Sequence, residues 1–408
     1  MVRRGIQLEQ LEKRLLLTVG VALDDGNLVI DGDATGDVAI VAVEGVYTVS
    51  DDDGDQVVEG DVTGSLRITL EGEDEGANDN VTIDLGGGSV QNVSANLGEG
   101  DNSLVISNGS VDGRLIYRGG DGSDDVTVSV ALGRGIYASM GDGDNSLTIT
   151  DSVGDPAEGE DPVAEVGGGI IYKGGGDSDT VTVDEGAAVK HMLFARLGGG
   201  DNTVDIAGKL GSSLIVHGRD GTDSVNVSGS VGRSVTASAG NGENIIEVSG
   251  EIVKNLTVRA GDDADTVTIT DTATIGGNVK LRLGGGDNLV DHLGLIEGNL
   301  SVRTDNADDV INTDEGTVEG EIKIELDVEH EHQSFFSRLL ARFRGHKRGD
   351  DGGGEGEGEG GEGDGGEGDD GDDQRSNRFR GWFSSVIERF RSRFSRHRGD
   401  GGEGDGGG

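Results

Sequence analysis

Short stretches of alternating apolar and polar residues recur along most of the chain. Before each turn stands a stretch such as LIYR (115–118), LFAR (193–196) or LTVR (256–259), and after it one such as VTV (126–128). Successive side chains of a β-strand point to opposite faces, so the first and third residues of these stretches are expected to face a core. Each repeat has a third, shorter inward contact, supplied by Val111, Leu132, Val189, Leu210, Val231, Ile252, Ile275, Ile296 and Val318.

The stretches repeat at a regular interval. Aligning the turns places acidic residues in one column, with steps of 20–23 residues and a single step of 35 that holds an insertion within 152–168. The column comprises Asp79, Asp101, Asp124, Asp144, Asp179, Asp201, Asp223, Glu243, Asp265, Asp287 and Asp308, with Asp55 as one earlier turn. The turns alternate between two kinds, GDNS-like and GSDD-like, so the unit is a pair of coils of about 43 residues.

Three short strands per repeat predict an all-β fold. Residues 18–331 are expected to form a single-stranded parallel β-helix, a solenoid with about 22 residues per coil and about 12 coils. No coil could bury enough apolar surface alone, so stacking has to build the core.

Composition excludes several classes of protein. Among 408 residues there are 78 Gly and no Cys, and 79 acidic residues face 33 basic ones, for a net charge of −46. A disulfide framework is excluded, and so is collagen, because Gly has no strict third-position period. No apolar run approaches the length of a membrane-spanning helix. The charge argues against nucleic acid as a partner.

The acidic turns are candidate cation sites. Stacking would place like carboxylates about 4.8 Å apart, where they repel each other, and carboxylate and backbone oxygens suit Ca²⁺. The segment GGDGSDDVT (119–127) resembles the nonapeptide of calcium-binding RTX proteins, which implies Ca²⁺-driven folding outside the cell. Solvated turns with diffuse counterions are the alternative. The candidate metal ligands are Asp121, Asp124, Asp177, Asp179, Asp220, Asp223, Asp262 and Asp265.

A basic column is expected on the outside of the pre-turn strands. It comprises Arg118, Lys173, Arg196, His217, Arg259, Arg282 and Arg303. Beside it runs an apolar row of Ile116, Tyr137, Ile171, Phe194 and Ile215. The basic side chains could pair with neighbouring turn carboxylates, or they could line a groove for an anionic polysaccharide.

Two residues interrupt the pattern of inward side chains. His292 and Asn312 stand where other coils carry Ile or Val, near the end of the solenoid. A catalytic site should break the repeat locally, but looser packing at the end explains both residues more simply. We therefore expect no enzyme activity, and the alternative is a polysaccharide lyase or hydrolase.

The N-terminal segment 1–17 is predicted to direct export or to cap the solenoid. Its residues LEKRLLL (11–17) resemble the LEPR-XLL segment at the start of bacterial surface and secreted repeat proteins. This resemblance implies export, and with the absence of Cys it favours an extracellular or cell-surface location in a bacterium.

The C-terminal tail is predicted to hold two basic amphipathic helices, at 332–348 and 375–398. A Gly/acidic linker (349–374) separates them and a Gly/acidic end (399–408) follows. The second helix presents one apolar face, made of Phe379, Trp382, Phe383, Val386, Ile387, Phe390 and Phe394. Such a face could contact the cell envelope, an anionic membrane or another acidic protein. The sequence thus predicts a non-enzymatic surface spacer that is attached through its tail.

Overall fold

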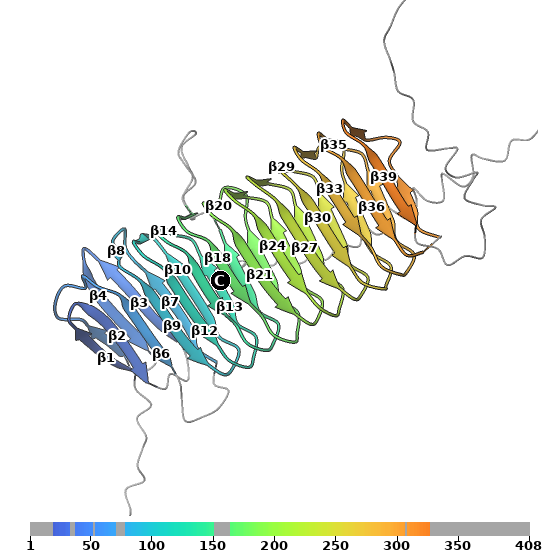
Figure 1. Cartoon of the computed structure of the whole chain (residues 1–408). Coiled ribbons are helices and arrows are strands. Elements are labelled where there is room, and N and C mark those ends of the chain that lie inside the picture. The colour runs from blue at the N-terminus through green and yellow to red at the C-terminus, as the bar shows by residue number, and fades with distance from the viewer. Residues whose placement is uncertain are drawn as a thin grey trace, which may run out of the picture. The chain divides into compact units, whose positions relative to one another are not determined.

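The computed structural model describes residues 19–32, 37–51, 54–70, 78–150, 164–306 and 308–326. The chain divides into two units, Met1–Gln333 and Ser334–Gly408, and all the described residues lie in the first. The N-terminal segment 1–17, both predicted amphipathic helices, the linker and the C-terminal end lie outside the described residues. The described part is all-β and forms a solenoid of stacked strands (Figure 1).

Three sheets, here called A, B and C, form the sides of the solenoid. Sheet A contains, in stacking order, β1 (Gly20–Asp24), β2 (Asn27–Gly32), β6 (Leu66–Leu70), β9 (Val93–Gly98), β12 (Leu115–Gly119), β15 (Ile136–Ser139), β18 (Ile170–Lys173), β21 (Leu193–Gly198), β24 (Leu214–Gly218), β27 (Val235–Gly240), β30 (Leu256–Ala260), β33 (Val279–Arg282), β36 (Leu300–Thr304) and β39 (Ile322–Leu326). Sheet B contains β5 (Gly54–Val57), β4 (Val46–Asp51), β3 (Asp37–Val43), β7 (Asn80–Asp84), β10 (Ser103–Ser107), β13 (Asp125–Val128), β16 (Ser146–Ile149), β19 (Thr180–Val183), β22 (Thr203–Ile206), β25 (Ser224–Val227), β28 (Ile245–Val248), β31 (Thr266–Ile269), β34 (Leu289–His292) and β37 (Val310–Asn312). Sheet C contains the two-residue strands β8 (Ser89–Val90), β11 (Ser110–Val111), β14 (Ala131–Leu132), β17 (Glu165–Val166), β20 (Ala188–Val189), β23 (Lys209–Leu210), β26 (Ser230–Val231), β29 (Glu251–Ile252), β32 (Thr274–Ile275), β35 (Leu295–Ile296) and β38 (Thr317–Val318).

Each coil contributes one strand to each sheet. Strands of successive coils pair in parallel and in register, as Leu193 with Leu214 in sheet A and Thr203 with Ser224 in sheet B. The predicted parallel solenoid is therefore confirmed, with about 22 residues per turn and about eleven turns where about twelve were expected.

The N-terminal end of the solenoid differs from the prediction. Two hairpins, β1–β2 and β3–β4, pair antiparallel around the turns Asp25–Gly26 and Glu44–Gly45. All four turn residues have positive φ, as tight two-residue hairpins require. The earlier coil expected at Asp55 is wrong, because Asp55 lies in β5, which pairs antiparallel with β4.

The inward positions build one continuous core. In a single coil, Leu115, Tyr117, Val126, Val128 and Val111 are all 0% exposed. Equivalent residues of the neighbouring coils stack on them through the parallel pairing. Burying each such side chain contributes about 1.5–3 kcal/mol, which a coil gains only when its neighbours cover it. Among the described residues no helix is long and apolar enough to cross a membrane.

Glycine at one corner of each turn is required by the close approach of the preceding coil. Gly198 has φ +99°, and a Cβ there would overlap the carbonyl oxygen of Gly175. We expect Gly198→Ala to lower the free energy of unfolding by about 3 kcal/mol, from backbone strain and from the clash with this backbone atom. Gly45→Ala is the matched control, because Gly45 also has positive φ (+83°) but a Cβ there meets nothing within 4 Å. Equal losses for both variants in urea unfolding of the full chain would contradict this account.

Candidate functional site

A column of buried polar residues follows the corner between sheets A and B. Each member directly precedes a strand of sheet B, and Asn and Asp alternate from coil to coil. We call this column the Asp/Asn ladder: Asp79, Asn102, Asp124, Asn145, Asp179, Asn202, Asp223, Asn244, Asp265 and Asn288, each at most 3% exposed. The ladder continues at Asp309, which is partly exposed.

The ladder corrects the predicted alignment of the acidic turn residues. Ser103 pairs with Asp125, so Asn102, and not Asp101, is the equivalent of Asp124. Every second acid of the predicted column therefore lies one residue outside the ladder. The alternation of GDNS-like and GSDD-like turns was the signal for it, because the third letter of GDNS is Asn and the third letter of GSDD is Asp.

Each Asn of the ladder joins the Asp before it to the Asp after it. Asn202 Nδ2 donates to Asp223 Oδ1 (2.8 Å), and Asn202 Oδ1 accepts from the Asp179 backbone N–H (2.9 Å). The same Nδ2 also donates to the carbonyl oxygens of Gly199 (3.1 Å) and Gly200 (3.0 Å) in its own turn. Asn102, Asn145 and Asn244 repeat this arrangement. The amide thus satisfies buried backbone groups of two coils at once.

The ladder carboxyls are held in an environment that disfavours their charge. Burial raises the pKa of Asp124 to about 7 and the pKa values of Asp179, Asp223 and Asp265 to about 6, although hydrogen bonds from the ladder Asn residues oppose the shift. The Tyr172 hydroxyl, also buried, donates to Asp179 Oδ1 (3.0 Å).

Acids outside the ladder bind the backbone of neighbouring coils. Asp142 Oδ1 accepts from Gly176 N–H (3.0 Å), and Asp201 Oδ1 accepts from Thr222 N–H (2.7 Å). Asp144 and Asp263 accept in the same way from Ser178 and Gly242. These carboxylates are therefore used as acceptors between coils, which gives them a structural role.

The structure separates the candidate calcium ligands into two groups. Asp124, Asp179, Asp223 and Asp265 belong to the buried ladder. The other four, Asp121, Asp177, Asp220 and Asp262, are exposed on the turns. In the described ranges, no three Asp, Glu, His or Cys side chains lie together as a group that could hold a metal ion. Specific Ca²⁺ binding stays a prediction of the sequence.

The basic column lies on the outer face of sheet A, as predicted. Its members pair coil by coil in one register, from Arg118 through Arg303. Lys173 and His217 are half-buried, whereas Arg118, Arg196, Arg259, Arg282 and Arg303 are exposed. The residues of the apolar row beside it are also partly exposed, with Ile171 at 41%.

Aromatic and basic side chains of this face contact each other. Lys173 Nζ donates to the Tyr137 hydroxyl (2.8 Å) and lies 4.9 Å from the centre of that ring. The rings of Phe194 and His217 are 5.5 Å apart. We call the surface formed by the basic column and the apolar row the sheet A strip.

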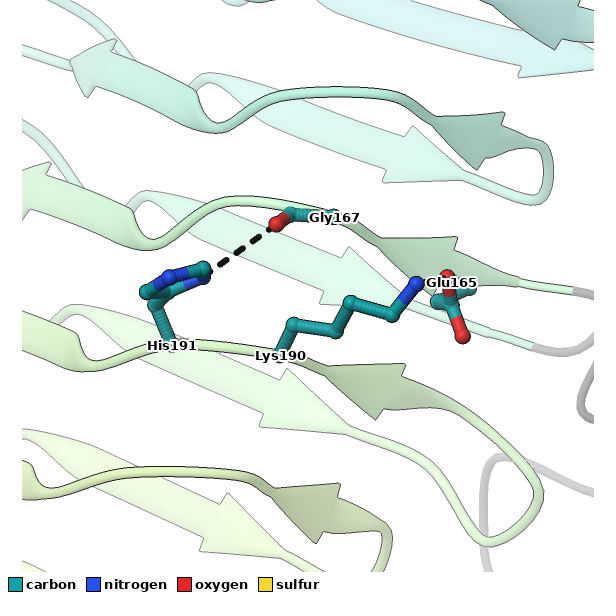
Figure 2. Close-up of polar contacts among 4 residues, drawn as sticks. All are labelled: Glu165, Gly167, Lys190 and His191. Carbon is teal, nitrogen blue, oxygen red and sulfur yellow. Dashed lines mark hydrogen bonds and ion pairs between the residues drawn. The ribbon is translucent and has the colours of Figure 1, made fainter.

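Four arginines of the strip have no polar side-chain partner in the described part of the chain. Arg118, Arg196, Arg259 and Arg282 make no side-chain hydrogen bond or ion pair with the described residues. Of the two alternatives for the basic column, pairing with turn carboxylates is therefore not seen for these four arginines among the described residues. Basic residues elsewhere do pair: Lys190 with Glu165, and Lys323 with Glu325. Figure 2 shows the first pair beside the 3.2 Å contact of His191 Nδ1 with the Gly167 carbonyl oxygen, where both contacts join adjacent coils.

The two interruptions of the repeat have different positions. His292 is 0% exposed and stacks on Ile269, as predicted for an inward residue. Burial lowers the pKa of His292, because the core disfavours the charged imidazolium. Asn312 pairs with Asp291 and is exposed, so its predicted inward position is wrong; the buried residue is Thr313.

Comparison of the chain with protein-family models, with curated proteins and with solved structures found no match. The stacked parallel strands define this chain as a parallel β-solenoid.

Proposed function

We propose that this chain is an exported, non-enzymatic solenoid that serves as a structural or adhesive spacer at the surface of a bacterial cell. The observation that carries the proposal is the continuous stack, in which sheet A runs through fourteen strands and the core and ladder positions recur in coil after coil. The core positions pack against each other and the ladder positions bond to each other in successive coils, as expected of a protein with a structural role. Export rests on the N-terminal resemblance and on the absence of Cys.

Attachment through the tail completes this proposal. The apolar face of 375–398, set among arginines, has the composition of a segment that binds an anionic membrane or an acidic protein surface. Fractionation of the cells that produce the full chain tests the proposal as a whole. Recovery in the surface or secreted fraction supports it, and recovery only in the cytoplasm contradicts it.

The sheet A strip supports a second candidate function, the binding of an anionic polysaccharide. Arg118, Arg196, Arg259 and Arg282, which form no ion pair with the described residues, supply charged donors along the solenoid, and the partly exposed Tyr137 and Phe194 rings offer apolar surface beside them. A linear anionic polymer that follows the stacking direction would meet several of these groups in succession.

The double variant Arg196→Ser/Arg259→Ser tests this candidate. Each lost charged hydrogen bond costs about 1.5–3 kcal/mol, so we expect binding of an anionic polysaccharide to the full chain to weaken at least about 10-fold. Arg134→Ser/Arg233→Ser is the control, because it removes two exposed arginines outside the strip. Equal weakening by both double variants would contradict a role for the strip. Polysaccharide cleavage that is lost on replacing Arg259 or Arg282 would instead show that the protein is an enzyme.

A further inference from the structure

The buried carboxyls of the ladder use one oxygen and leave the other without a partner. Oδ1 of Asp124 accepts from Asn102 Nδ2 (2.9 Å) and from the Asn102 backbone N–H (3.3 Å). The Oδ2 atoms of Asp124, Asp179, Asp223 and Asp265 are buried and accept no hydrogen bond. An ionised carboxylate that is buried in this way would lack half of its acceptor contacts.

In three coils the unpartnered oxygen lies against glycine. A Cβ added to Gly119 would overlap Oδ2 of Asp124, and the same holds for Gly174 with Asp179 and for Gly218 with Asp223. Near the same points lie carbonyl oxygens of the following coil: Met140 O, Leu197 O and Ala239 O, at 2.7, 2.8 and 2.7 Å from the respective Cβ positions. In these three coils Oδ2 and a carbonyl oxygen of the following coil therefore lie near the same point. A proton on Oδ2 would let the carboxyl donate toward that carbonyl, whereas a negative charge there would be repelled by it.

The other groups around the ladder carboxyls are acids, hydroxyls and, beside Asp179, the backbone N–H of Gly175, which lowers the pKa of that carboxyl. The charge of Asp101 raises the pKa of Asp124, and that of Asp201 raises the pKa of Asp223. Asp263 and Asp309 raise the pKa of Asp265 in the same way. The buried hydroxyls of Tyr117 and Tyr172 lie beside Asp124 and Asp179. Burial raises the pKa of the Tyr117 hydroxyl, and the charges of Asp79 and Asp125 raise it further. Asp101, Asp201, Asp263 and Asp309 therefore raise the pKa of the ladder carboxyls beside them, whereas the two tyrosine hydroxyls lower it.

We infer that the ladder is a pH-responsive device, in which the buried carboxyls hold protons that link successive coils in mild acid and release them above neutral pH, which weakens the stack. The unpartnered Oδ2 atoms, their carbonyl neighbours and the alternation with Asn together support this inference. This inference does not depend on the proposed function of the solenoid.

The direction of the pH effect follows from the raised pKa values of the ladder carboxyls. An ordinary Asp has a pKa of 3.8, whereas in the folded chain that of Asp124 is about 7 and those of Asp179, Asp223 and Asp265 are about 6. Between these values the folded state binds more protons than the unfolded state. The stabilisation by the ladder is therefore complete below about pH 4 and is lost as the pH rises through 6 and 7.

The test compares thermal unfolding of the full chain at pH values from 5 to 8. The ladder variant Asp124→Asn/Asp179→Asn/Asp223→Asn/Asp265→Asn replaces each carboxyl by an amide, which can donate as the protonated acid does. The control variant Asp112→Asn/Asp121→Asn/Asp262→Asn/Asp271→Asn changes the net charge equally at exposed positions. We expect the wild-type midpoint to fall with rising pH. The ladder variant should depend on pH less steeply than the wild type, because Asp205 and Asp291 keep pKa values raised by burial, and at pH 8 it should exceed the wild type by at least about 5 °C.

A control variant that parallels the wild type would support the inference, and identical pH profiles for the ladder and control variants would overturn it. If the ladder variant does not fold, infrared difference spectra of the wild-type chain decide. Loss of a buried protonated-carboxyl band between pH 5.5 and 8 supports the inference, and its absence at pH 5.5 overturns it.

Discussion

Replacing Asn202 by Ala is expected to lower the free energy of unfolding of the full chain by about 3–5 kcal/mol. The substitution removes the acceptor of the Asp179 N–H and the donor to Asp223 Oδ1 and to two glycine carbonyls, all at a position that is 0% exposed. Each buried polar group left unpaired costs about 1–3 kcal/mol. The thermal midpoint should fall by about 10 °C.

Asn226→Ala is the control for this prediction. Asn226 lies on the outer face of β25, is half-buried, and its side chain donates one hydrogen bond, to Asp205 Oδ1 (3.0 Å). We expect a loss of about 1 kcal/mol or less. If Asn202→Ala and Asn226→Ala were equally destabilising in thermal and urea unfolding, the ladder would not be the specific link between coils that its hydrogen bonds indicate.

The repeat of the strands could be predicted from the sequence because its physical signal is local. Alternation of apolar and polar residues places Leu115 and Tyr117 inward and Arg118 outward, and the structure confirms each position. The third inward contact, at Val111 and its equivalents, is confirmed as sheet C. The alternation is defined within a single strand. The inward and outward positions can therefore be predicted even where the turns of different coils are aligned wrongly.

The ladder could not be predicted by counting acids. Asp101 and Asp124 have the same charge and adjacent positions in the repeat, but Asp101 is exposed and Asp124 is buried. What distinguishes them is pairing: the Asp124 carboxyl accepts from the amide of Asn102 in the preceding coil, and its backbone N–H donates to the amide oxygen of Asn145 in the following coil. The hairpins at the N-terminal end were missed for a related reason. The turns at Asp25–Gly26 and Glu44–Gly45 reverse the chain within a sheet, whereas a coil was expected.

If the Asp/Asn alternation organises the stack, the chain should tolerate deletion of two coils better than deletion of a single coil that brings two ladder carboxyls together. Removing residues 203–244 joins Asn202 to Ile245, which occupies the same register position as Thr203, and brings Asn202 next to Asp265. The Asp/Asn alternation is kept. Removing 224–244 brings Asp223 next to Asp265, and removing 203–223 brings Asn202 next to Asn244. In each single-coil deletion one contact in the ladder joins like groups.

These three deletions separate the ladder from the core. The two-coil deletion removes more apolar core than either single-coil deletion, so stacking alone predicts that it is the least stable of the three. The Asp223–Asp265 contact lacks the amide donor between two buried carboxyls, whose charges would repel each other about 5 Å apart. That variant should be the least stable at neutral pH and should recover in mild acid.

Thermal unfolding of the three deletion variants at pH 7.5 therefore tests most directly whether the Asp/Asn ladder organises the solenoid. We predict a midpoint for the two-coil deletion at least about 5 °C above that of the single-coil deletion of 224–244, which brings Asp223 next to Asp265. Midpoints that simply decrease with the number of residues removed would contradict the account.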